Sequence, residues 1–203
     1  MNKTRLENLS DGVFAIVMTL LIIDIRVPEM HGPLIGALYN LLPLFVSYFL
    51  SFAVLSSFWL SHHGVFHLFI RTINRPCIQL NTLYLSFIAL IPFSAHLLGS
   101  NPADQVAVIW YGANIFLAGA AAILLFLYVL RSGEIENADF TQRMLRQALI
   151  RHILTPSLAL LGIAASFVSI PLALFLFVFP AIFNAIPGSL NFTERLLGFR
   201  IPE

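Results

Sequence analysis

Long apolar stretches follow one another along this chain, separated by short segments that carry proline, glycine and charged residues. A helix that crosses a membrane needs about 20 largely apolar residues. By that measure the pattern predicts an all-α membrane protein with six transmembrane helices, which form a single domain over residues 1–203. The predicted helices span residues 6–27, 34–60, 77–98, 106–130, 149–168 and 170–186.

The boundary between the last two helices rests on a short polar interruption. The apolar run from Ile153 to Phe192 is too long for one helix, and the stretch from Ser166 to Pro171 is the best candidate for a turn inside it. The alternative is a single span in this region, which would leave five helices.

The composition supports a membrane protein and excludes several other classes. The chain has 59% hydrophobic and only 10% charged residues, whereas soluble domains carry about 25% charged residues. The 11 basic and 10 acidic residues nearly cancel, so no electrostatic footprint for nucleic acid is present. The single Cys77 excludes an internal disulfide and a cysteine-rich metal site.

The distribution of basic residues predicts the orientation. With six helices, every Lys and Arg except Arg26 falls on one side of the membrane. That side holds Lys3, Arg5, Arg71, Arg75, Arg131, Arg143, Arg146, Arg151, Arg195 and Arg200. Because cytoplasmic loops are enriched in Lys and Arg, we expect a multi-pass protein of the cell membrane with both termini in the cytoplasm.

The first helix places its apolar and acidic residues on different faces. At 100° per residue, one stripe of the helix is centred on Ile16 and includes the residues within about 40° of it, namely Leu9, Gly12, Leu20 and Ile23. Thr19 lies at the edge of this stripe. Asp11 lies about 140° from Ile16, so it is expected to point towards neighbouring helices. The helix is apolar all round, so periodicity alone leaves ordinary packing open as the role of the stripe.

Polar residues on the second and third helices are predicted to lie at the same depth as Asp11. They are Trp59, His62 and His63, with Asn81 on the third helix. A buried carboxylate needs hydrogen-bond donors, and the Trp59 indole, the histidine rings, the Ser10 hydroxyl and the Arg5 guanidinium can supply them.

Two other interpretations of the histidines remain. His63 and His67 are four residues apart on one helical face, so together with His62 they could bind a metal. No carboxylate or cysteine in that stretch completes such a site, and we predict no metal. The histidines could also be ordinary interfacial residues.

Two motifs resemble the transmembrane protein 175 family of potassium-permeable channels. In the family pattern R-x-x-x-F-S-D-G, Arg5, Ser10, Asp11 and Gly12 match and Leu9 replaces phenylalanine. The family's W-x-x-H-H-like motif is matched by Trp59, His62 and His63, and Asn81 resembles a family asparagine.

This resemblance implies a homotetramer in the lipid bilayer, in which the first helix of each subunit lines a central pore. The matching constriction residues are Ile16, Leu20 and Ile23, and a family hydroxyl near the constriction matches Thr19. It also implies that Arg5, Ser10, Asp11, Trp59, His62, His63 and Asn81 form a structural polar network. The permeant ion would be potassium, with sodium and other monovalent cations as further candidates, and no cofactor is implied.

A second class of function is a small membrane enzyme or a proton-coupled carrier that uses Asp11 with His62, His63 and His67. Such sites need several convergent acid, base or metal groups. The chain has no G-x-S-x-G, no H-E-x-x-H and no phosphate-binding glycine loop. We therefore predict a channel and not an enzyme.

Overall fold

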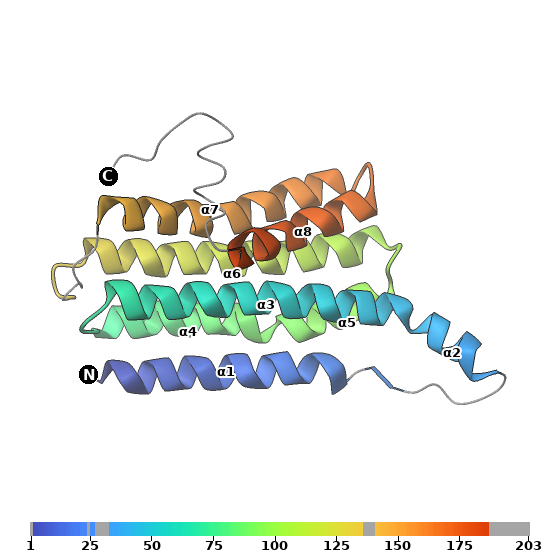
Figure 1. Cartoon of the computed structure of the whole chain (residues 1–203), viewed down its shortest axis with the longest axis horizontal. Helices are drawn as coiled ribbons and strands as arrows, with labels where there is room; N and C mark the ends of the chain where they lie inside the picture. The colour runs from blue at the N-terminus through green and yellow to red at the C-terminus, as the bar shows by residue number, and fades with distance from the viewer. Residues whose placement is uncertain (1, 24, 27–32, 136–140, 187–203) are drawn as a thin grey trace.

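The fold is a bundle of long helices whose axes run roughly side by side (Figure 1). The computed structural model describes residues 2–23, 25–26, 33–135 and 141–186, and this part of the chain forms helices and no β-strand. The helices are α1 (Lys3–Ile23), α2 (Leu34–Asn40), α3 (Leu42–Phe69), α4 (Arg75–Ala89), α5 (Ile91–Ser100), α6 (Gln105–Arg131), α7 (Gln142–Ala165) and α8 (Ile170–Ala185).

Five segments are long and apolar enough to cross a membrane, namely α1, α3, the α4–α5 pair, α6 and α7. The prediction of an all-α membrane protein is confirmed. The turn predicted between the last two helices is present, since α7 ends at Ala165 and Ser169 caps α8 by accepting from the Leu172 N–H at 3.4 Å. With 16 residues, α8 is shorter than the other spans.

Several predicted helix boundaries were wrong. The first helix ends at Ile23, where the charges of Asp24 and Arg26 interrupt the apolar run; Asp24 and residues 27–32 lie outside the described residues. The predicted helix 34–60 is divided at Leu41, because Pro43 has no N–H to continue the helix. Beyond that break, α3 continues past Leu60 to Phe69.

The start of α7 also differs from the prediction. This helix begins at Gln142, seven residues before the predicted position, because Thr141 caps it by accepting from the Met144 N–H at 3.2 Å. The end predicted for the last helix, Ile186, directly follows Ala185, and Arg195 and Arg200 lie outside the described residues.

A buried asparagine bridges the break between α4 and α5. Pro92 lies at the start of α5, and at the break before it the Leu90 N–H donates to the Phe87 carbonyl at 3.3 Å. With its amide oriented to meet both groups, Asn114 of α6 donates to the Phe87 carbonyl at 3.1 Å and accepts from the Ile91 N–H at 3.2 Å. Membrane helices tolerate proline where neighbouring side chains satisfy the freed backbone groups.

Helices α6, α7 and α8 approach closely around the ring of Phe177. A Cβ atom added to Gly112 of α6 would lie 2.6 Å from Ile163 and 2.7 Å from Phe177, and one added to Gly162 of α7 would clash with the same ring. On α6, Gly119 faces Pro156 in the same way. The small residues of α6 therefore serve packing within the chain, as expected for membrane helices.

We expect Gly112→Ala to lower the free energy of unfolding by about 1–3 kcal/mol, the usual cost of overpacking a filled core. Gly64→Ala is the matched control, because nothing lies within 4 Å of a Cβ atom at this α3 position. Thermal unfolding of the detergent-solubilised protein measures both. Equal thermal unfolding midpoints for the two variants would show that the packing around Phe177 accommodates the added methyl group without loss of stability.

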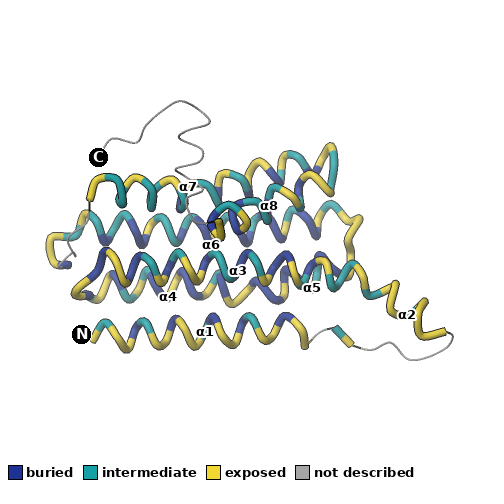
Figure 2. Tube along the Cα trace, in the orientation of Figure 1, coloured by how far each residue is buried: buried dark blue, intermediate teal, exposed yellow. Residues whose placement is uncertain are grey.

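Helix α1 lies at one edge of the bundle and uses only one face for packing. Leu6, Ser10, Phe14, Val17 and Leu21 are buried against the bundle, where α1 contacts α3, α4 and α5. The opposite face is exposed along its length, as the alternating colours of α1 show in Figure 2. The single chain thus leaves one long apolar helix covered on one side only.

Candidate functional site

A chain of buried hydrogen bonds joins α1, α3 and α4 in the half of the bundle that holds the N-terminus. Asn81 of α4 lies at its centre: its side-chain oxygen is 2.7 Å from His62 Nε2, and its side-chain nitrogen donates to Ser10 Oγ at 3.1 Å. The Ser10 hydroxyl in turn donates to the Leu6 carbonyl at 2.9 Å. All three side chains are buried, so this cluster fixes the three helices to one another.

Aromatic rings enclose His62. The imidazole is stacked on the rings of Tyr84 and Phe66, with centroid distances of 5.6 and 4.5 Å. The ring centroid of Phe14 of α1 lies 6.2 Å from that of the imidazole. The Tyr84 hydroxyl donates to the Phe58 carbonyl at 3.2 Å. Tyr84 was not predicted as part of the site, although a tyrosine three residues after Asn81 shares its helical face and was a usable signal.

Asp11 and Trp59 meet at the rim of this cluster. The Trp59 indole N–H donates to Asp11 Oδ1 at 2.9 Å. Both residues are exposed in the single chain and line an open groove of about 620 Å³ between α1 and α3. Asp11 therefore points to the side of α1, away from the face of Ile16, as its angular position requires.

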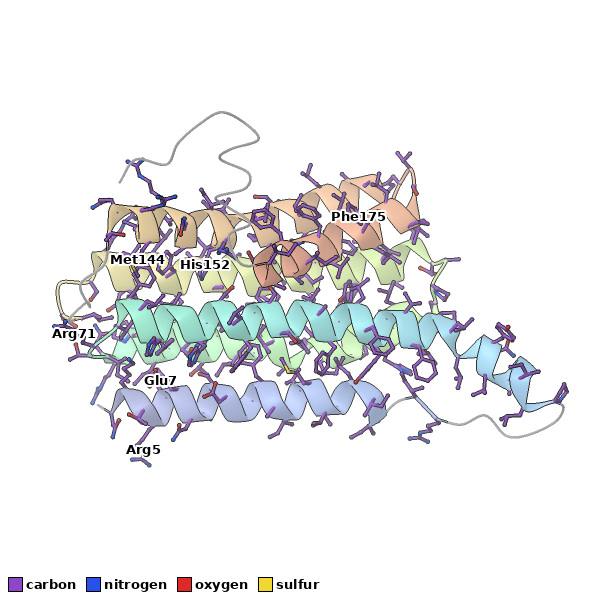
Figure 3. The ribbon with its side chains drawn as sticks, in the orientation of Figure 1. Arg5, Glu7, Arg71, Met144, His152 and Phe175 are labelled. Atoms are coloured by element: carbon purple, nitrogen blue, oxygen red, sulfur yellow. The ribbon has the colours of Figure 1, made fainter. Side chains whose placement is uncertain are left out.

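Arg5 is not brought into the cluster. It lies about 140° around α1 from Ser10, and Figure 3 shows its side chain pointing away from the bundle while Glu7 points towards it. Glu7 is 3.6 Å from Lys3, whose ammonium group donates to the Ile70 carbonyl at 2.9 Å. Within the single chain Arg5 therefore does not join these polar groups, because the two sets of residues occupy different faces of the helix, and its place in the polar network stays a prediction.

The histidines of α3 do not converge. His62 points into the bundle, whereas His63 and His67 are exposed. The rings of His63 and His67 are stacked with their centroids 5.8 Å apart, and the Trp59 ring is stacked on His63 with a centroid distance of 5.7 Å. In the described ranges, no three His, Cys, Asp or Glu residues are placed to hold a metal ion. This arrangement also leaves Asp11 and the histidines without a shared reaction centre.

The apolar stripe predicted on α1 lies on the surface of the single chain. Ile16 and Ile23 are each 60% exposed and Leu20 is 40% exposed. Thr19 is exposed beside them, and its hydroxyl donates to the Ile16 carbonyl of its own helix at 2.8 Å. No side chain of the described bundle covers this face.

Residues 5–92 match the family model described as endosomal/lysosomal potassium channel TMEM175. The chain is 34% identical to a potassium channel of Streptomyces collinus over 183 residues, which cover 86% of this chain and 87% of that protein. The chain belongs to the TMEM175 family. It is accordingly a channel protein and not an enzyme, as the sequence predicted, and the enzyme interpretation of Asp11 and the histidines is not supported.

Two other members of the TMEM175 family are similar to this chain, one in structure and one in sequence. The fold is similar to the crystal structure of a lysosomal potassium-selective channel TMEM175 homolog from Chamaesiphon minutus, with a TM-score of 0.77, 28% identity and coverage of 90% of this chain and 96% of that chain. The Bos taurus endosomal/lysosomal proton channel TMEM175 is 42% identical over 104 residues, which cover 46% of this chain and 22% of that protein.

Proposed function

We propose that this chain is one subunit of a homotetrameric, potassium-permeable cation channel in the cell membrane. The observation that carries the proposal is the exposed apolar stripe on α1, a membrane-length helix at the edge of the bundle. Relatives named potassium channels indicate the permeant ion. Sodium and other monovalent cations are further candidates, and the proposal requires no cofactor and no nucleic acid.

The pore lies between subunits. Within one chain, α1 packs against α3, α4 and α5 on one side and leaves its other side open. Four copies around an axis would bring four such stripes together and give a lipid-insulated path, as closed rotational symmetry allows. The groove beside Asp11 and Trp59 would then face a neighbouring subunit or lipid.

The constriction is a stack of apolar rings. Ile16 forms the narrowest ring, and Leu20 and Ile23 form further rings about 6 and 10 Å along the helix. Apolar constrictions gate by excluding water. The Thr19 hydroxyl, which donates within its helix, keeps its oxygen lone pairs available to a passing cation. We expect modest selectivity for potassium over sodium, because these side chains offer no ring of charges or carbonyls.

The topology places the N-terminal end of α1 in the cytoplasm and counts α8 as a sixth, short crossing. The basic residues of the described chain support this orientation, because most lie at that end and Arg26 lies at the other. They are Lys3, Arg5, Arg71, Arg75, Arg131, Arg143 and Arg146. With six crossings, both termini lie in the cytoplasm.

Cysteine accessibility tests this proposal. In a Cys77→Ala background, Leu20→Cys should become sensitive to a charged methanethiosulfonate reagent, which would block the potassium current, and native mass spectrometry should show four chains. Leu117→Cys on α6 is the control, because Leu117 is 43% exposed and Leu20 is 40% exposed. Equal insensitivity of both variants, or a conducting monomer, would contradict the proposal.

We expect Asp11→Ala to weaken assembly more than permeation. The variant removes the acceptor of the Trp59 indole, and a hydrogen bond between membrane helices is worth about 0.6–2 kcal/mol. The fraction of tetramer after detergent extraction should fall, while the reversal potential in mixed potassium and sodium stays unchanged. Trp59→Phe should behave alike, and Asn8→Ala, also exposed on α1, serves as the control. A shifted reversal potential with normal assembly would place Asp11 in the pore.

A further inference from the structure

Helix α8 is shorter than the two helices beside it, and a cavity lies beyond its end. This helix packs against both α3 and α7 and ends at Ala185, part-way along the bundle, while its two neighbours continue towards the end that holds the N-terminus (Figure 1). The cavity has a volume of about 320 Å³, and the residues that line it include Leu60, Gly64, Met144, Arg151 and Asn184. It is thus bounded by α3, by α7 and by the last turn of α8.

A largely apolar groove continues from this cavity between α3 and α8. Its volume is about 380 Å³, and it shares Leu60 and Asn184 with the cavity. On α3 it extends to Ala53, two helical turns from Leu60 and towards the middle of the membrane-spanning part. Its apolar lining residues are Ala53, Leu60, Ala181, Ile182, Ala185 and Ile186. The cavity and the groove together form one elongated site with an apolar half.

Arg151 lies where the two halves meet. Its Nη1 donates to the Asn184 carbonyl and to Asn184 Oδ1, both at 3.2 Å, and Asn184 Nδ2 donates to Ser57 Oγ at 3.2 Å. These bonds hold the guanidinium at the junction of α3, α7 and α8. The described lining of the cavity includes Arg151 and no aspartate or glutamate, so this half of the site presents a positive charge.

The charge also lies at the depth of lipid phosphates. The apolar run of the last two helices begins at Ile153, two residues after Arg151, and α8 ends at the same level. In the proposed topology this level is the cytoplasmic boundary of the apolar layer. Basic pockets between transmembrane helices on that side bind anionic lipid head groups, and arginine matches the geometry of phosphate oxygens with its N–H donors.

We propose that the elongated site binds one anionic phospholipid of the cytoplasmic leaflet, with its phosphate at Arg151 and one acyl chain in the groove between α3 and α8. The bound lipid fills the space that the short α8 leaves and links α3 to α7. This inference goes beyond the proposed function, because lipid binding here does not require α1 to line a pore. It uses the proposed topology only to name the leaflet.

Native mass spectrometry of the detergent-solubilised assembly tests the site. The probes are dioleoyl phosphatidylglycerol, phosphatidylcholine with the same chains, and inorganic phosphate. We expect one phosphatidylglycerol per chain, with an affinity at least about tenfold higher than that of phosphatidylcholine, because the second head group has no net negative charge. Inorganic phosphate at the same concentration should not displace the lipid, because it has no acyl chain for the groove.

Two variants alter the site in different ways. Arg151→Gln should weaken binding of phosphatidylglycerol about tenfold and leave that of phosphatidylcholine unchanged. Arg146→Gln is the matched control, since Arg146 is an exposed arginine of α7 outside the lining of the cavity and the groove. Gly64→Leu should reduce binding of both lipids by filling the cavity, because nothing lies within 4 Å of a Cβ atom there. Gly36→Leu on α2, where a Cβ atom also has open space, is its control.

Three outcomes would overturn the proposal. Equal lipid binding by the parent, Arg151→Gln and Gly64→Leu would place the lipid elsewhere. If these two variants reduce the fraction of assembled protein and leave the number of lipids per chain unchanged, the cavity is an interface with a neighbouring chain. If phosphatidylglycerol binds only after removal of residues 187–203, that segment of the chain is the occupant.

Discussion

Ile16→Asn is expected to raise the cation conductance about five- to tenfold, which corresponds to lowering the barrier by about 1–1.4 kcal/mol. Ile16 is 60% exposed on the face of α1 that we place at the pore axis. A ring of four isoleucines repels water, whereas four asparagine amides offer hydrogen bonds to water and to hydrated cations. Because hydrated ions would no longer be stripped, discrimination of potassium over sodium should fall as conductance rises.

Ile22→Asn is the control for this effect. Ile22 is also exposed on α1, at 44%, but it lies about 120° around the helix from Ile16. The same polar substitution there should leave conductance and reversal potential unchanged. Paired recordings in matched potassium and sodium gradients measure both quantities. An Ile16→Asn channel indistinguishable from the parent would remove Ile16 from the permeation path and leave helix packing as its role.

The existence of the long helices could be predicted from the sequence, because a membrane span needs little more than sufficient apolar length. Their ends could not be predicted equally well. Helix α3 runs beyond Leu60 because its polar residues find partners: His62 bonds with Asn81, and His63 stacks on Trp59. Apolar length cannot show that such partners exist, since the partner of His62 lies on α4 and the partner of His63 is a ring one turn earlier on α3 itself.

Depth along the membrane and direction around a helix had different predictive value for the candidate site. Matching depth correctly brought Asp11 towards Trp59 and Ser10 towards Asn81. The same argument placed Arg5 in the cluster, although the helical geometry applied to Asp11 puts Arg5 on the face of Ile16. The pairing of Asn81 with both Ser10 and His62 depends on how three helices pack. The periodicity of residues within one helix carries no information on that packing.

Asn81→Leu is expected to lower the free energy of unfolding by about 1–3 kcal/mol, because it leaves His62 and Ser10 without their shared partner in a buried environment. Asn81 is fully buried and bonds with α3 on one side and α1 on the other. Losing these bonds should also loosen α1, so the variant should form fewer tetramers. Thr82→Val is the control, since Thr82 is an exposed neighbour whose hydroxyl bonds only within its own helix.

A double-mutant cycle distinguishes the hydrogen bond from simple packing at this position. His62→Phe alone should destabilise the protein, because it leaves the Asn81 oxygen unsatisfied. The Asn81→Leu and His62→Phe pair replaces both polar partners by apolar groups, and the phenyl ring can occupy the space between Phe66 and Tyr84. Removing both partners of a buried hydrogen bond is far less costly than removing one. The double variant should therefore recover about 1 kcal/mol or more relative to the sum of the single variants in thermal or denaturant unfolding. Strict additivity would mean that Asn81 and His62 stabilise the fold independently and that their close approach contributes nothing.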